Sequence, residues 1–197
     1  MIEAALCAFE APTYLIFSTN VPTLLYFSHF PALIFSLACA LYILYQGRGR
    51  LEAYILFWSL IPFTIWVAAD LVVFAHNRSD VVLFLWSILV IVEPLVHGGL
   101  WYLLRVTSTG RDISFALKSF MLVIFVPLFV VTATSLGLPG FDITYCIAVE
   151  GVYLHYAYVL EILFMTLIVI DAIRFAYASG NREKRNQIIY LAIGIIL

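Results

Sequence analysis

Two ionisable residues, Glu93 and His97, lie four positions apart in a stretch that is otherwise almost wholly apolar. That spacing places both side chains on one face of a helix, with Trp101 one turn further on. One interpretation is a polar pocket that binds a ligand or transfers a proton. The other is a Glu–His hydrogen bond that joins two helices. A metal site needs three or four ligands, and this helix supplies only two.

Other apolar stretches also carry polar side chains. Glu161, with Tyr158 on the same helix face, is expected near the depth of Glu93 in the membrane. The two carboxylates could share a proton or bind opposite ends of a cationic ligand. Asp70 is expected in the outer half of its helix. We expect no catalytic residue and no cofactor. The predicted ligand-binding residues are Glu93, His97, Trp101, Glu161, Tyr158 and Asp70.

Composition sets the environment of these residues. Of the 197 residues, 64% are hydrophobic and only 11% are charged, and the mean hydropathy is +1.07. A soluble domain has about 45–50% apolar and about 25% charged residues, so a cytosolic enzyme and a disordered tail are excluded. The net charge of −2 leaves no basic patch for a nucleic acid. We therefore predict an all-α, polytopic membrane helical bundle whose first partner is the lipid bilayer.

A membrane-spanning helix needs about 20 apolar residues. Five stretches qualify, at roughly 22–45, 51–75, 81–104, 113–136 and 152–173. A sixth begins at Ile188 and reaches the end of the sequence after ten residues. We therefore expect five full spans, a truncated sixth and seven spans in the complete protein. Residues 1–21 are predicted to be an extracytoplasmic interfacial segment, and residues 22–197 an incomplete transmembrane sensor bundle.

The charges of the connecting loops predict the orientation. With the N-terminus outside, nine of the ten basic residues face the cytoplasm, as the positive-inside rule requires. The plasma (inner) membrane is then the expected location. Cys7 and Cys146 both fall on the oxidising outer side, where a disulfide between them is possible. Near the inner end, Asp171 is expected to pair locally with Arg174 or to extend toward the interface.

Three stretches of the sequence carry a family resemblance. They are FWSLIPFTIWVAADLVVF at 57–74, EPLVHGGLWYLL at 93–104 and NREKRNQIIYLAIGIIL at 181–197. Together with the topology, they resemble the N-terminal seven-transmembrane sensor region of bacterial histidine kinases and diguanylate cyclases. The resemblance implies a receptor region that passes a signal to a cytoplasmic domain of the same chain, in a homodimer. It carries over no catalytic residue.

Two functional hypotheses follow. The leading one is a sensory input region that binds a small ligand or senses the membrane, with no enzymatic activity in this segment. The full-length protein would then be a histidine kinase or a diguanylate cyclase. The alternative is an intramembrane metal-dependent hydrolase of the seven-helix type, which needs several His and Asp ligands on different helices. Haem-based electron transfer and transport fit less well, because the His residues lie at different depths and no internal repeat is visible.

Overall fold

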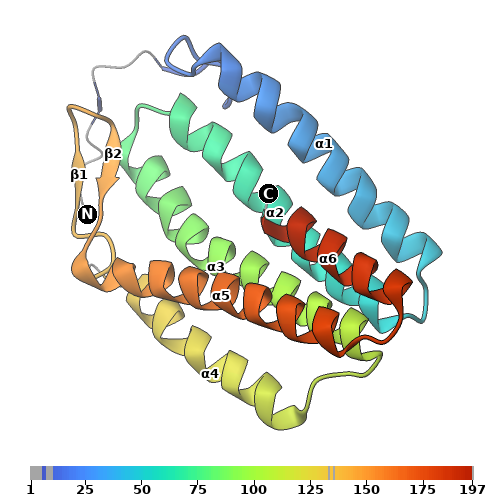
Figure 1. The fold of residues 1–197 in the computed structure, drawn as a ribbon. Coiled ribbons are helices and arrows are strands. Elements are labelled where there is room, and N and C mark those ends of the chain that lie inside the picture. The colour runs from blue at the N-terminus through green and yellow to red at the C-terminus, as the bar shows by residue number, and fades with distance from the viewer. Residues whose placement is uncertain (1–5, 8–10, 133, 135, 197) are drawn as a thin grey trace.

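The computed structural model describes all residues except 1–5, 8–10, 133, 135 and 197. Six α-helices lie in the described part of the chain and form one bundle, in which successive helices run in opposite directions (Figure 1). This confirms the predicted all-helical bundle. The helices are α1 (Thr23–Gln46), α2 (Leu51–Ala75), α3 (Ser79–Thr109), α4 (Phe115–Thr132), α5 (His155–Ala178) and α6 (Arg182–Ile196).

Helix α3 is the centre of the bundle. It packs against α2, α4, α5 and α6, whereas α1 and α4 lie on opposite flanks (Figure 1). The main core joins α3 to α4, α5 and α6 and includes Leu104, Leu128, Phe164 and Ile168, each at most 1% exposed. Any side chain on the inner face of α3 is therefore close to at least one other helix.

Four helices, α1 to α4, are long and apolar enough to cross a membrane. Large apolar side chains on α1 and α4 are highly exposed, for example Phe27 at 74% and Leu122 at 70%. Apolar patches of this extent are typical of a surface that contacts lipid or another protein rather than water. These features indicate a membrane protein. The expected fifth and sixth spans, in α5 and α6, are not among the four.

Small residues allow α1 to approach α2 closely. Ser36 and Ala40 are buried, and the hydroxyls of Ser36 and Thr64 lie 2.9 Å apart across the helix pair. The spacing of four residues that Ala32, Ser36 and Ala40 share is a common helix-packing pattern in membranes. In this chain the stripe packs inside the bundle.

Several helix boundaries differ from the predicted ones. Helix α3 continues beyond Arg105 to Thr109 and stops at Gly110, whose φ of +68° lies in the left-handed region that favours glycine. Helix α6 begins at Arg182 rather than at Ile188. Its first turn is charged, which concealed it from a search for apolar runs. The side chain of Asn181 accepts a hydrogen bond from the backbone N–H of Glu183 and so caps this turn.

A small cap covers the end of the bundle at which α2 meets α3 and α5 begins. It contains a two-stranded antiparallel sheet, β1 (Gly140–Asp142) and β2 (Ile147–Val149), followed by a 3₁₀ turn, η1 (Val152–Leu154). A disulfide joins Cys7 to Cys146, with their Cα atoms 5.7 Å apart. The backbone N–H of Cys7 donates to the carbonyl oxygen of Asn77 in the turn between α2 and α3. The disulfide therefore fixes the N-terminal segment to the cap, and the backbone hydrogen bond fixes it to the turn between α2 and α3.

The expected interfacial segment at 1–21 lies partly outside the described residues. Its described apolar side chains Tyr14, Leu15 and Phe17 are exposed, and Thr13 and Phe17 form an isolated β-bridge. The hydroxyl of Tyr26, on α1, donates to the carbonyl oxygen of Ile16 at 2.7 Å. This contact holds the segment against the start of α1.

Candidate functional site

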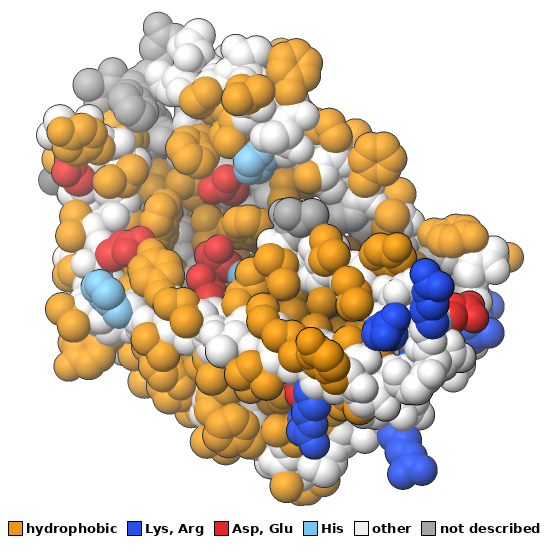
Figure 2. Space-filling model, viewed as in Figure 1, with side chains coloured by type: hydrophobic (Ala, Val, Ile, Leu, Met, Phe, Trp, Pro, Cys, Tyr) orange, Lys and Arg blue, Asp and Glu red, His pale blue; other side chains and the backbone are white. Residues whose placement is uncertain are grey.

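A cavity of about 170 Å³ lies between α2, α3 and the beginning of α5. Three carboxylates and three aromatic rings share its wall with small and aliphatic side chains. Figure 2 shows the corresponding hollow on one face of the molecule, with acidic side chains gathered in and beside it. We call this space the acidic cavity. It is lined by Trp66, Asp70, Trp86, Leu89, Val90, Glu93, Leu154, Ala157, Tyr158 and Glu161.

Four of the six predicted ligand-binding residues line the acidic cavity. Asp70 comes from α2, Glu93 from α3, and Tyr158 and Glu161 from α5. Each of the three helices therefore contributes one carboxylate. Helical spacing places an aromatic ring on the same face as each, because Trp66 precedes Asp70 by four residues, Trp86 precedes Glu93 by seven and Tyr158 precedes Glu161 by three.

The three carboxylates differ in their partners. His29 on α1 places its Nε2 atom 2.8 Å from Asp70 Oδ2, and both side chains are about four-fifths buried, at 19% and 23% exposed. For the half-buried side chains of Glu93 and Glu161, the structure gives no hydrogen bond or ion pair within the described residues. Asp70 thus has a side-chain partner on α1, whereas the other two carboxylates face the cavity without such a partner.

Tyr158 connects the wall of the acidic cavity to the cap. Its hydroxyl donates to the carboxylate of Glu150 at 2.7 Å rather than to Glu161, three residues further on. Glu150 follows directly after β2, so the hydrogen bond ties the first turn of α5 to the cap. Any movement of the cap would therefore shift an aromatic side chain of the cavity wall.

His97 lies in a second, adjacent cavity of about 640 Å³ between α2, α3, α5 and α6. Trp66 and Glu93 line both spaces. The His97 Nδ1 atom lies 2.9 Å from the backbone carbonyl oxygen of Glu93, which can only accept, so Nδ1 carries the proton in this arrangement. The helix-joining hydrogen bond between the two side chains, considered from the sequence, is not the contact that His97 makes.

Trp101 belongs to neither cavity. It is 3% exposed, and its indole N–H donates to Asp171 Oδ2 on α5 at 2.9 Å. Arg105 Nε lies 3.1 Å from the same oxygen, and the Arg105 guanidinium lies over the Trp101 ring. Asp171 therefore joins α5 to α3 through Arg105, in place of the expected local pairing with Arg174.

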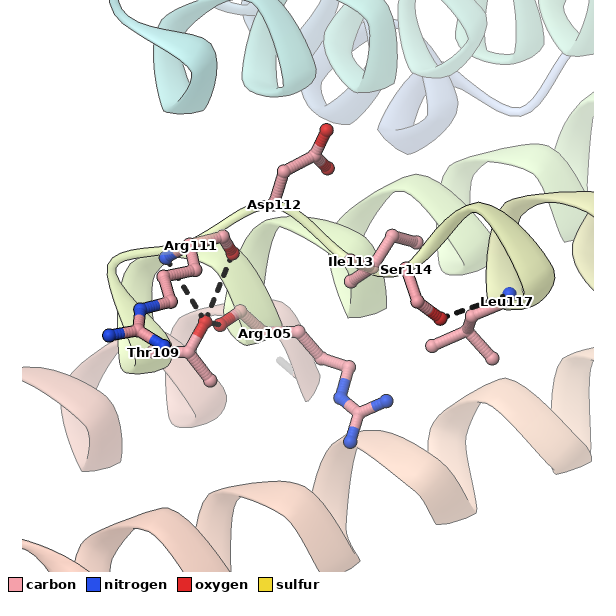
Figure 3. Close-up of a pocket in the computed structure, with 7 residues that line it drawn as sticks. All are labelled: Arg105, Thr109, Arg111, Asp112, Ile113, Ser114 and Leu117. Carbon is pink, nitrogen blue, oxygen red and sulfur yellow. Dashed lines mark hydrogen bonds between the residues drawn. The ribbon is translucent and has the colours of Figure 1, made fainter.

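A third cavity, of about 500 Å³, lies at the turn between α3 and α4. Figure 3 shows Arg105 extending from α3 toward α5, while Asp112 points to the opposite side of the turn. The Asp112 carboxylate accepts hydrogen bonds from the Tyr102 hydroxyl and from the Lys118 ammonium, and these bonds, that of Lys118 foremost, hold the pKa of Asp112 below its usual value. These contacts fix the turn and leave Arg105 directed at the joint between α3 and α5.

Sequence reasoning left three residues of the site off its predicted set. Trp66 and Trp86 precede Asp70 and Glu93 by four and seven residues, which places them on the same helix faces. This spacing could be read from the sequence. The contact between His29 and Asp70 could not be read from helical spacing, because the two residues are 41 positions apart and meet only through the packing of α1 against α2.

No family model, no curated protein and no solved structure matches this chain. Among the described residues, no group of three or more His, Cys, Asp or Glu side chains is arranged to hold a metal ion. Any functional conclusion must therefore rest on the acidic cavity and its surroundings.

Proposed function

We propose that this chain is the sensory input region of a membrane receptor and that a small organic cation binds in the acidic cavity. The observation that carries the proposal is the meeting of one carboxylate from each of α2, α3 and α5 with three aromatic rings in one cavity. Binding there would change how α3 packs against α5. The expected partner is a cytoplasmic signalling domain of the same chain, and the expected assembly is a homodimer.

The chemistry of the wall favours a cation. A carboxylate inside a membrane protein is costly unless it is paired, and Glu93 and Glu161 have no ion-pair partner within the described residues. A bound ammonium group would supply the missing positive charge. Trp66, Trp86 and Tyr158 offer ring faces that attract a cation, each interaction being worth about 0.5–2 kcal/mol. The volume of about 170 Å³ is close to that of a cavity that admits benzene, so the ligand is small.

The distribution of charge supports an orientation with the N-terminus outside. Nine of the ten basic residues lie at one end of the bundle, in or beside the turns after α1, α3 and α5, and Arg78 alone lies at the other end. We propose that α5 crosses the plasma membrane as a fifth span and that α6 enters it as part of a sixth, within a protein of seven spans. The acidic cavity, which lies near the cap, would then be reached from the outside.

The resemblance to the sensor regions of bacterial histidine kinases agrees with this proposal in topology and in the position of the polar residues. The alternative, an intramembrane metal-dependent hydrolase, gains no support from the described residues. Asp70 and His29 form a pair on two helices, but a zinc site needs at least three ligands around one point.

The proposal is tested by measuring cation binding to the purified chain. Tetramethylammonium and phenethylammonium are titrated while thermal unfolding is followed, with N-methylacetamide as a neutral probe. At least one of the two cations should raise the unfolding temperature, and Glu93→Gln and Glu161→Gln should each weaken that binding about tenfold, because each removes one charge-assisted contact. Glu52→Gln, in the first turn of α2 and outside the cavity, is the control.

Two results would contradict the proposal. The first is that neither cation stabilises the protein more than the neutral probe. The second is that Glu93→Gln and Glu161→Gln bind the cation as tightly as the unchanged chain. In the full-length protein, the same two substitutions should also abolish the change in output that the cation causes. If the two substitutions abolish cation binding but the cation still changes the output, the cavity binds a cation without sensing it.

A further inference from the structure

An apolar groove of about 440 Å³ runs between the second half of α5 and the length of α6. Its floor consists of three buried alanines, Ala172, Ala176 and Ala192. Exposed β-branched side chains form its walls, and they are Val169, Ile173, Ile189, Ile193 and Ile196. Small residues in the floor and branched residues in the walls give a narrow slot, of a shape that suits a hydrocarbon chain.

The groove is polar at one end only. Arg185, in the first turn of α6, lines it there, next to Tyr177, whose side chain is 88% exposed. The structure gives the Arg185 guanidinium no ion-pair partner among the described residues. Residues 182–185 carry three basic side chains and one acidic one. Figure 2 shows basic side chains near the start of α6, beside a continuous apolar surface over α5 and α6.

We propose that this groove binds an anionic phospholipid of the cytoplasmic leaflet, with an acyl chain on the alanine floor and its phosphate at Arg185. The groove and the lipid are complementary along their length, because each is apolar over most of its length and charged at one end. Basic residues beside the cytoplasmic ends of membrane helices attract anionic lipid headgroups. A guanidinium also fits a phosphate through two parallel hydrogen bonds.

A zwitterionic lipid would fill the apolar slot equally well but would gain less at its polar end, since its own cation competes with Arg185 for the phosphate. The groove should therefore distinguish headgroups at Arg185 and should hold any acyl chain through Ala172 and Ala176. The inference rests on α5 and α6 lying in the membrane, as proposed above, and does not depend on the acidic cavity.

The test uses the full chain in nanodiscs made of equal parts phosphatidylcholine and phosphatidylglycerol. After gentle extraction, native mass spectrometry measures which lipids stay bound. The unchanged chain should retain phosphatidylglycerol in preference to phosphatidylcholine. Arg185→Gln should lower that preference about tenfold, through the loss of a charged hydrogen-bond donor. Ala176→Phe should fill the slot and lower the retention of both lipids.

Two matched variants complete the experiment. Arg182→Gln removes a cation from the same turn that does not line the groove, and Ala178→Phe adds the same ring to an exposed position of α5. Both should behave as the unchanged chain does. The proposal is overturned if Arg182→Gln lowers the preference as much as Arg185→Gln, or if Ala176→Phe retains both lipids.

A measurement of the oligomeric state distinguishes a bound lipid from a second copy of the chain as the occupant of the groove. If Ala176→Phe dissociates a dimer of the unchanged chain and leaves lipid retention unaltered, the groove is an interface between two copies and the lipid proposal is wrong. Binding of the organic cation is measured on the same samples and should not respond to Arg185→Gln. A failure of the lipid site and a failure of the acidic cavity are therefore seen separately.

Discussion

Asp171 shows how a single buried carboxylate can hold two helices together. It is 5% exposed, and its Oδ2 atom receives the indole N–H of Trp101 and lies 3.1 Å from Arg105 Nε. Both partners come from α3, one turn apart. Removing one partner of a buried charged group lowers the free energy of unfolding by more than the loss of a surface ion pair does, because the remaining group stays buried without its full set of partners. Asp171, Trp101 and Arg105 therefore add a polar joint to the apolar packing of α3 against α5.

Replacing Trp101 with phenylalanine should test this joint. Trp101→Phe keeps an aromatic ring near Phe164 but removes the N–H that donates to Asp171. We expect the free energy of unfolding to fall by about 1–3 kcal/mol, because the buried Asp171 carboxylate loses one of its two donors among the described residues and keeps only Arg105. The measurement is equilibrium unfolding of the purified chain in detergent micelles. Trp58→Phe, at a position that is 67% exposed, should change stability by much less.

His76 gives the fold a dependence on pH. Both of its ring nitrogens are buried and have no hydrogen-bond partner among the described residues. Burial, together with the positive charge of Arg78, lowers the pKa of His76 below the ordinary 6.5, and Asp80 offsets this in part. The unfolded chain therefore binds a proton more readily than the folded chain. The contribution of His76 to stability should be fully present above pH 6.5 and should be lost as the pH falls below that value.

This prediction is checked by following the unfolding temperature of the purified chain between about pH 7.5 and about pH 5.5. His76→Phe replaces the imidazole with an apolar ring of similar shape, so it should reduce the fall in unfolding temperature. His155→Phe, at an exposed position, is the control and should leave the pH dependence as it is. An unchanged pH dependence in His76→Phe would show that another group is responsible.

At the scale of the elements, the close approach of α2 and α3 sets the width of the site. A Cβ atom at Gly99 would lie 2.4 Å from Ser59 Oγ and 3.2 Å from Ser59 Cβ. Ser59 is 2% exposed, and its hydroxyl donates to the carbonyl oxygen of Ile55 at 2.8 Å, so it has little room to move. Glycine at position 99 therefore allows Trp66 and Glu93, on these two helices, to line the same cavity.

Gly99→Ala should lower the free energy of unfolding by about 1–3 kcal/mol, as overpacking does. Gly194→Ala is the matched control, because a Cβ there would meet no atom within 4 Å and alanine favours the helix. Adding Ser59→Ala to Gly99→Ala removes the clashing hydroxyl and should restore part of the lost stability. If the double variant is no more stable than Gly99→Ala, the contact with Ser59 is not the cause.

The helices could be predicted from the sequence and the cap could not, for a physical reason. Runs of apolar residues longer than 18 positions indicate membrane helices, and α1 and α2 begin and end within one residue of the expected bounds. Strands β1 and β2 are three residues each and show no periodic pattern. They depend on contacts across a turn, at the end of the molecule where the disulfide between Cys7 and Cys146 also lies.

Within the candidate site, polar residues in apolar runs could be identified from the sequence, whereas the contacts between helices could not. Glu93, Glu161, Tyr158 and Asp70 stood out because they are polar residues in apolar runs, and the structure brings these four together. Trp101 shares a helical face with His97 by spacing alone. The side chain turns toward Asp171 instead, because the partner lies on α5 and sequence spacing says nothing of the neighbouring helix.

At the scale of the whole molecule, charge and covalent bonding divide the bundle into two different ends. The turns after α1, α3 and α5 carry the basic residues, whereas the opposite end holds the disulfide and the small sheet. A positive end and a disulfide-bonded end fit the proposed orientation, in which the positive end faces the cytoplasm and the disulfide faces the oxidising side. In that proposed orientation the acidic cavity would lie near the outer side, and Arg185 of the apolar groove would lie near the cytoplasmic side.

Cysteine labelling would test this orientation directly. In a Cys39→Ala background, which removes the free cysteine of the described chain, cysteines are introduced singly at Tyr145, Gln46 and Gly180. Tyr145 lies between β1 and β2, Gln46 ends α1, and Gly180 lies between α5 and α6. A membrane-impermeant maleimide applied to intact cells should label only Tyr145→Cys, and the other two should react only after the cells are made permeable. Gly180 reaches the cytoplasm only if α5 crosses the membrane, so labelling of Gly180→Cys in intact cells would contradict the fifth span. Labelling of Gln46→Cys in intact cells would show that the whole orientation is the reverse of the proposed one.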